Sequence, residues 1–247
     1  EVKDHLANLI AFAIDYFRNL QKKYGKGKDR KTEIRPFDTI EATKVVVRNL
    51  KLYVNREEGF VGTSLKKDEY VADCSDIDDI IVFTADGKMI ITKVTEKSYI
   101  GKNIVHVGVF KKNDTRTVYN LVYRNGNDKI SYIKRFTVTG IIRDKEYDVV
   151  EPHKDSQILY FSANPNGEAE VISVILRQAE SVKKLKWDIN FADILIKGRG
   201  SRGNIVTKYA IKRIELKEKG VSTLKPRKIW YDPIVHRLNT EGRGELL

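Results

Sequence analysis

The sequence predicts an all-β domain that is built from repeated β-hairpins and preceded by one α-helix. From about Thr39 onward, short apolar runs alternate with turn residues, which is typical of short strands joined by tight turns. A recurring hairpin at regular spacing is the signature of a radial repeat. We therefore expect a propeller-like ring of about five or six four-stranded blades. The hairpin-like segments start at Leu52, Ile81, Leu121, Leu159 and Ile194.

The spacing of these segments supports the repeat. Consecutive starts differ by 29, 40, 38 and 35 residues, which leaves room for four short strands and their turns in each unit. Asp86-Gly87 lies between two apolar runs and predicts a type I′ turn, in which both central positions have positive φ. A β-sandwich or a pair of small barrels is the alternative architecture.

The first 24 residues have a different periodicity. Apolar side chains from Val2 to Tyr24 recur at steps of three and four, which places them on one stripe of an amphipathic helix that Gly25 ends. We expect a helix over 1–24, a basic linker over 25–38 and the β domain over 39–247. The apolar stripe either packs on that domain or belongs to the end of a longer helical element, and we favour the second.

The composition indicates a polyanionic partner. The 247 residues include 46 Lys and Arg against 34 Asp and Glu, a formal net charge of +12. The charge is segregated, since residues 111–143 hold 8 Lys or Arg against 2 acids and residues 193–247 hold 13 against 6. Because nucleic acid is the commonest intracellular polyanion, clustered charge favours a phosphate-binding surface over a merely basic one.

Other features exclude several classes of protein. The single cysteine, Cys74, rules out an internal disulfide framework, and the four scattered histidines give no zinc-ligand spacing. The sequence contains no apolar run of about 18 residues that could span a membrane. We expect a soluble cytoplasmic protein.

One glycine-rich segment is suited to phosphate contact. Gly198 to Gly203 contains glycines that let the backbone approach phosphate, and Arg199 and Arg202 can bind its oxygens. A flexible hairpin tip is the alternative. Nearby basic side chains are Lys197, Lys208, Lys212 and Arg213. Phosphate contact and a solvated strand face suit a second basic group equally well, namely Lys134, Arg135 and Arg143.

Two further clusters are less specific. Asp76, Asp78 and Asp79 invite the hypothesis of a metal-dependent nuclease, but no matching His, Lys or carboxylate set accompanies them, so we interpret them as an inter-blade loop. No catalytic residue and no metal ligand is predicted. Three bases around Pro226 form a plausible but unspecific DNA site in a predicted loop, namely Lys225, Arg227 and Lys228.

Two stretches resemble a known family. Residues 10–34, with a Lys-Tyr-Gly step and an Arg-x-Thr-Glu-Ile run, resemble the end of the coiled coil in the A subunit of bacterial type IIA topoisomerases. Asp79 to Ile91, with an apolar run, a Thr, a turn Gly and a following apolar pair, is similar to the blade-forming repeat of the C-terminal domain of those subunits. Looser likeness to distal blades of the topoisomerase IV A subunit lies at residues 203–209 and 229–232.

The resemblance implies a β-pinwheel, a disc of blades whose basic rim binds and bends duplex DNA without sequence preference. It implies a non-catalytic part of an isomerase that positions the transported duplex during strand passage. ATP and Mg²⁺ would serve other domains, and no cofactor would bind this part. The partners would be the ATPase B subunit and the rest of the A subunit, in an A2B2 assembly. The location would be cytoplasmic and nucleoid-associated.

One departure from the family bears on the choice between its members. Gyrase carries a Gln-Arg-Arg-Gly-Gly-Lys-Gly box for DNA wrapping, and only Tyr99 to Lys102 and Gly198 to Gly203 resemble remnants of it. This favours topoisomerase IV over gyrase. A stand-alone β-propeller module that binds an acidic protein is the alternative function.

The positive rim is expected at residues 98–102, 129–143 and 197–213. The expected DNA-binding residues are Lys102, Lys129, Lys134, Arg135, Arg143, Lys197, Arg199, Arg202, Lys208, Lys212 and Arg213.

Overall fold

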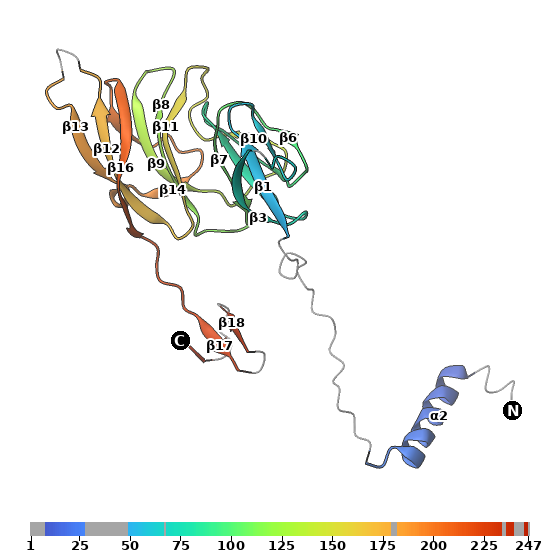
Figure 1. Cartoon of the computed structure of the whole chain (residues 1–247). Coiled ribbons are helices and arrows are strands. Elements are labelled where there is room, and N and C mark those ends of the chain that lie inside the picture. The colour runs from blue at the N-terminus through green and yellow to red at the C-terminus, as the bar shows by residue number, and fades with distance from the viewer. Residues whose placement is uncertain are drawn as a thin grey trace. The chain divides into compact units, whose positions relative to one another are not determined.

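The computed structural model describes residues 8–27, 49–66, 68–178, 182–233, 236–239 and 245–246. The chain divides into two compact units, residues 1–45 and 46–247. The first contains a helix. The second contains the strands, which form a propeller-like ring of four small sheets and one further small sheet (Figure 1). The expected domain limit at residues 38 and 39 lies outside the described residues.

Helix α2 (Leu9–Tyr24) confirms the helical period of the first segment. Gly25 ends it, and the backbone N–H of Gly25 donates to the carbonyl of Gln21 at 2.8 Å. None of the helix residues is buried, so the apolar side chains of Leu9 and Phe17 are exposed. Within the described residues, no helix is long and apolar enough to cross a membrane.

Sheets A and B have four antiparallel strands each. Sheet A has the order β3-β1-β2-β6, and sheet B has the order β10-β5-β4-β7. The strands of sheet A are β1 (Leu50–Asn55), β2 (Phe60–Gly62), β3 (Glu69–Cys74) and β6 (Ser98–Tyr99). The strands of sheet B are β4 (Asp79–Thr84), β5 (Lys88–Lys93), β7 (Ile104–Phe110) and β10 (Glu146–Asp148).

Sheets C and D depart from this size. Sheet C has five strands in the order β11-β8-β9-β14, with β15 also on β9, and sheet D has three in the order β13-β12-β16. Sheet C consists of β8 (Val118–Arg124), β9 (Ser131–Thr137), β11 (Gln157–Asn164), β14 (Ile196–Gly198) and β15 (Asn204–Thr207). Sheet D consists of β12 (Glu168–Leu176), β13 (Lys186–Asn190) and β16 (Ile211–Ser222), with the 3-10 turn η1 (Phe191–Asp193) after β13. A small sheet contains β17 (Trp230–Asp232), β18 (Arg237–Asn239) and β19 (Glu245–Leu246).

The sheets of the ring are interlocked along the chain. Strand β6 follows the β4–β5 hairpin of sheet B, yet it pairs with β2 of sheet A. Strand β10 follows the β8–β9 hairpin of sheet C and returns to β5 of sheet B. Strands β14 and β15 follow β13 of sheet D and return to β9 of sheet C. Each of the first three sheets is therefore completed only after the next sheet has begun.

The expected number of blades and two of the five hairpins are wrong. The described residues form four sheets in the ring, and only two of these have four strands. The 159–171 segment joins β11 of sheet C to β12 of sheet D, and the 194–207 segment contributes two separate strands to β9. Apolar runs on either side of a turn have the same pattern whether they pair with each other or with different sheets. The hairpins β1–β2, β4–β5 and β8–β9 are confirmed.

The core lies between successive sheets. Strand β4 contributes Ile80 and Val82 to a cluster with sheet A, and Ile81 and Phe83 to a cluster with sheet C. A third cluster joins sheets C and D. Because side chains alternate between the two faces of a strand, an inner strand with both faces covered is apolar at almost every position. This explains the continuous apolar runs of the sequence.

Candidate nucleic-acid interface

The glycine-rich loop at residues 198–203 is fastened to sheet C. The Lys134 side chain on β9 lies beneath it, and its Nζ donates to the carbonyl oxygens of Arg199 at 2.6 Å and Ser201 at 2.9 Å. The Tyr123 hydroxyl donates to the carbonyl of Arg202 at 2.8 Å. Burial lowers the pKa of Lys134 to about 8. Side chains of two strands, β8 and β9, therefore hold the loop, which argues against the alternative of a flexible tip.

The two arginines of this loop differ in how their charge is compensated. Arg202 pairs with Asp128, and its Nε lies 3.1 Å from a carboxylate oxygen of Glu151. Its guanidinium also covers the ring of Tyr132 at 4.6 Å from the centroid. Partial burial alone would raise the pKa of Asp128, but hydrogen bonds from Ile130 N–H and the Tyr132 hydroxyl, with the Arg202 charge, lower it on balance. Two carboxylates thus compensate the Arg202 charge locally.

Arg199 has no carboxylate partner among the described residues. Its Nη1 donates to the carbonyl oxygen of Gly140 at 2.6 Å, and its guanidinium lies 4.2 Å from the centroid of the Tyr147 ring. A backbone carbonyl and an aromatic face leave the formal charge in place. Of the two predicted arginines, Arg199 is the one whose charge no carboxylate compensates among the described residues.

The expectation that Lys134 and Arg135 contact DNA is wrong. Lys134 is 2% exposed and Arg135 is 1% exposed, so neither side chain can reach a phosphate on the surface. Both belong to β9, where residues 131–136 are all buried because sheet faces and the 198–203 loop cover the strand. Lys134 anchors the loop, and Arg135 joins sheets C and D.

Three further predicted residues are engaged in ion pairs. Arg143 binds Asp79 through Nε at 3.0 Å and Nη2 at 2.9 Å. Lys129 Nζ lies 3.2 Å from Asp155 Oδ2, and Arg213 Nε lies 2.6 Å from Glu215 Oε1. Four predicted lysines are at least partly exposed, and the described part of the chain gives them no ion pair. They are Lys102, Lys197, Lys208 and Lys212.

The acidic segment before β4 forms a turn, as the loop interpretation expects. The Ser75 N–H donates to Asp78 at 2.9 Å, and the Ser75 hydroxyl donates to Asp76 at 2.9 Å. Asp79 begins β4 and pairs with Arg143. Among the described residues, no three His, Cys, Asp or Glu side chains are grouped to hold a metal ion.

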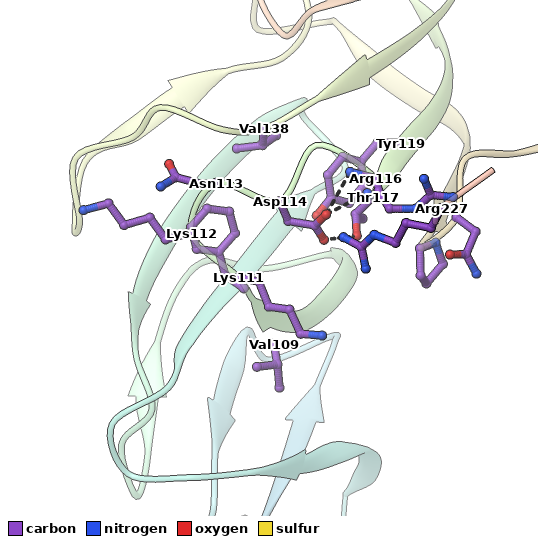
Figure 2. Close-up of a pocket in the computed structure, with 13 residues that line it drawn as sticks. Val109, Lys111, Lys112, Asn113, Asp114, Arg116, Thr117, Tyr119, Val138 and Arg227 are labelled. Carbon is purple, nitrogen blue, oxygen red and sulfur yellow. Dashed lines mark hydrogen bonds between the residues drawn. The ribbon is translucent and has the colours of Figure 1, made fainter. Parts of the chain in front are cut away.

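A pocket that the sequence does not reveal lies where sheets B, C and D end together. Its lining comes from the end of β7 and the start of β8, with the turn between them, and from residues that follow β9, β11 and β16. The cavity measures about 580 Å³ (Figure 2). Its lining includes four basic residues from two distant segments, namely Lys111, Lys112, Arg116 and Arg227.

The turn between β7 and β8 shapes one side of this pocket. Asp114 accepts the N–H of Arg116 at 2.8 Å and the hydroxyl of Thr117 at 2.6 Å. Burial alone would raise the pKa of Asp114, but the Thr117 hydrogen bond, the backbone donors and the Lys111 charge lower it on balance. Asp114 is therefore ionised at neutral pH, and its oxygens are occupied by the turn itself.

The other side is formed by the C-terminal strap, which we define as residues 222–228. The Thr223 N–H donates to the carbonyl of Gly167 at 3.1 Å, and the Thr223 hydroxyl accepts from Arg135 at 3.0 Å. Further along, Arg116 Nη1 donates to the carbonyl of Lys225 at 3.2 Å. The strap thereby carries its three bases to the 111–117 turn.

Part of the signal for this pocket is present in the sequence. Both basic segments stand out in the charge count, and the bases around Pro226 are predicted to form a loop site. Their meeting is not predictable, because Arg116 and Lys225 are 109 residues apart and no pattern links them.

Comparisons with known proteins identify relatives of this chain. The family described as "Topoisomerase C-terminal domain, Bacteroidota" matches residues 51–219. The chain is 27% identical over 217 residues to the A subunit of DNA topoisomerase 4 from Borreliella burgdorferi, a match that covers 87% of this chain and 33% of that protein. A crystal structure of the C-terminal domain of DNA topoisomerase IV is also similar, with 13% identity, a TM-score of 0.44 and coverage of 70% of this chain and 63% of that one.

The family match covers more than half of the chain. The chain belongs to the topoisomerase C-terminal domain family. It is the C-terminal domain of a type IIA topoisomerase whose A subunit is like that of topoisomerase IV. The resemblance identified from the sequence is thereby confirmed. The chain spans a third of the length of its curated relative.

Proposed function

We propose that this domain binds duplex DNA without sequence preference, bends it, and so positions the transported duplex during ATP-dependent strand passage. It does so as a non-catalytic, β-pinwheel part of the A subunit. ATP and Mg²⁺ act on other domains, in an A2B2 assembly with the ATPase B subunit that works on the nucleoid.

The observation that carries this proposal is the surplus of exposed positive charge in a domain of this family. Ion pairs with carboxylates account for Lys129, Arg143, Arg202 and Arg213. The described residues provide no such partner for a second set of bases, namely Lys102, Lys197, Arg199, Lys208 and Lys212. Uncompensated Lys and Arg bind phosphates by releasing counterions, which gives affinity without sequence preference.

Binding to a random-sequence duplex at several salt concentrations tests the proposal. We expect the logarithm of the association constant to fall linearly with the logarithm of the salt concentration, with a slope of about 0.9 per phosphate contact. Binding that is absent, or insensitive to salt, contradicts the proposal. It would favour a module that recognises an acidic protein.

A matched pair of variants tests which bases contact DNA. Lys197→Gln removes an uncompensated charge and is expected to reduce the salt slope by about one. Lys129→Gln removes a charge that Asp155 already compensates, so we expect a smaller change. Equal effects would contradict this distinction.

DNA bending has a separate readout. Nicked circles ligated in the presence of the domain report any handed wrapping as a change in linking number. Because the wrapping box of gyrase is absent, we expect bending that helps small circles to close but leaves the linking number unchanged. A consistent shift in linking number would contradict the topoisomerase IV-type function.

A further inference from the structure

The pocket between the 111–117 turn and the C-terminal strap has the charge of a phosphate site. Lys111 lies close enough to Asp114 to lower its pKa, so this pair is locally compensated. The described residues give no ion pair to Lys112, Arg116 or Arg227. The strap adds two more exposed bases beside them, namely Lys225 and Lys228. An excess of positive charge in one concave site raises the local concentration of anions.

The side chains differ in a way that suits a phosphodiester. Arg116 and Arg227 offer planar guanidinium groups that can bind two phosphate oxygens at once, while Lys112 offers a mobile point charge. In Figure 2 the Lys112 side chain extends to one side of the pocket and those of Arg116 and Arg227 to the other. Asp114 lies between them in this view, so the two guanidinium groups are the direct donors and Lys112 adds positive charge on the other side.

A tyrosine hydroxyl adds a neutral donor to the lining of this pocket. Tyr119 on β8 lines the pocket and is 5% exposed. Within the described residues its hydroxyl makes no hydrogen bond to protein, and the buried side-chain atoms without a partner are Ser131 Oγ and Ser201 Oγ, so the Tyr119 hydroxyl is accessible from the pocket. Burial, and to a smaller extent the Asp114 charge, raise the pKa of this phenol, so it remains a donor at neutral pH.

We propose that this pocket holds one phosphodiester group of a bound nucleic-acid duplex. The inference rests on the proposed function and names its principal contact. The guanidinium groups of Arg116 and Arg227 bind the phosphate oxygens, the Tyr119 hydroxyl donates to one of them, and Lys112 adds positive charge on the other side of the pocket. Lys225 and Lys228 on the strap meet neighbouring phosphates. The cavity of about 580 Å³ is within the range of pockets that enclose a small ligand, so it accommodates a phosphate with its attached sugars.

The test compares two variants that lose the same charge. In Lys112→Gln/Arg227→Gln the pocket loses two cations, and in Lys183→Gln/Lys184→Gln the connection at the opposite end of sheet D loses two. Binding of a fluorescent random duplex of about 30 base pairs is measured by anisotropy at four salt concentrations. We expect the pocket variant to bind about tenfold more weakly, with a salt slope smaller by about two, and the control variant to stay close to the parent.

A third variant separates the pocket from general electrostatics. Tyr119→Phe keeps the charge and the buried ring but removes the hydroxyl, and we expect affinity to fall about threefold with an unchanged salt slope. Circular dichroism melting identifies any variant that fails to fold. If Lys112→Gln/Arg227→Gln fails to fold, Tyr119→Phe still tests the pocket.

The outcomes distinguish the two proposals. If the parent domain does not bind the duplex at all, the proposed function fails. If the parent binds but Lys112→Gln/Arg227→Gln and Lys183→Gln/Lys184→Gln weaken it equally, or Tyr119→Phe has no effect, the pocket assignment is overturned and the proposed function stands. Selective loss in the pocket variants supports both.

Discussion

Arg135 of sheet C donates a hydrogen bond from Nη2 to the carbonyl oxygen of Gly167, at 2.9 Å, across the boundary to sheet D. The same guanidinium reaches Asn120 Oδ1 at 3.0 Å and Thr223 Oγ1 at 3.0 Å. Burial lowers the pKa of Arg135, and the nearby carboxylate of Glu170 offsets part of that shift. One buried cation thus joins two sheets and the C-terminal strap.

We predict that Arg135→Met destabilises the domain far more than its position on a basic strand suggests. The variant removes the donor to Asn120 Oδ1 and Thr223 Oγ1 and one of the donors to the Gly167 carbonyl, and it leaves the buried carboxylate of Glu170 without its nearby cation, so the free energy of unfolding should fall by about 3–5 kcal/mol. Urea unfolding followed by circular dichroism measures the change.

Arg143→Met is the matched control for Arg135→Met. Its ion pair with Asp79 is on the surface, where water and salt screen the charges, so we expect a much smaller loss of stability. Similar losses in the two variants would contradict the structural role of the buried guanidinium.

The sequence predicts the hairpins better than the sheets they build. The β4–β5 connection is a case where the predicted position is right and the predicted turn type is wrong. Gly87 has φ +86°, but Asp86 does not have positive φ, and the Gly87 N–H donates to the carbonyl of Thr84 at 2.9 Å. This geometry is a three-residue loop with glycine in the left-handed region rather than a type I′ turn.

Long-range placement is beyond the sequence pattern for a physical reason. A hydrophobic run indicates that a strand is buried, but it does not indicate which strand it pairs with. The pattern therefore predicts β11 and β12 as one hairpin, although they belong to different sheets. The identity of a basic residue likewise indicates its charge but not its exposure to solvent. Lys134 and Arg135 are therefore predicted to bind DNA, although carbonyl oxygens in the interior satisfy them.

We predict that acidification destabilises the domain through His106. This imidazole lies among Phe83, Tyr119 and Phe161, and burial, with a smaller effect of the Arg56 charge, lowers its pKa from 6.5 to about 4. Between these two values the unfolded chain binds a proton that the folded domain does not. Stability from this residue is therefore complete above pH 6.5 and is lost progressively toward pH 4, by about 2–3 kcal/mol.

Urea midpoints at about pH 7 and about pH 5, on either side of the ordinary histidine pKa, measure this effect. The control is His106→Phe, which keeps an aromatic ring in the cluster and cannot titrate, so the difference between the two midpoints should shrink. An equal difference in the parent and in His106→Phe would assign the acid sensitivity to other groups.

We predict that Lys134→Met releases the 198–203 loop while the strands of sheet C persist. The variant removes the donor to the carbonyl oxygens of Arg199 and Ser201. Amide hydrogen exchange over residues 199–203 should accelerate by about tenfold, because local opening no longer breaks those two bonds. Lys197→Met, an exposed neighbour, is the control. Unchanged protection of the loop in Lys134→Met would contradict the anchoring role.

The same loop contains two glycines for which we predict opposite outcomes. Gly203 has φ +95°, and a Cβ there would lie 2.4 Å from the carbonyl oxygen of Ile133 in β9, so Gly203→Ala must distort the loop or the strand. At Gly200, no atom lies within 4 Å of the position that a Cβ would take. We expect Gly203→Ala to lower the free energy of unfolding by about 2 kcal/mol or more, because the new side chain meets backbone that cannot move away. Gly200→Ala should change it by no more than about 0.5 kcal/mol, since alanine restricts the unfolded chain without meeting the folded one. Thermal melts of the two variants measure the contrast, and comparable losses would show that the loop is not held against β9.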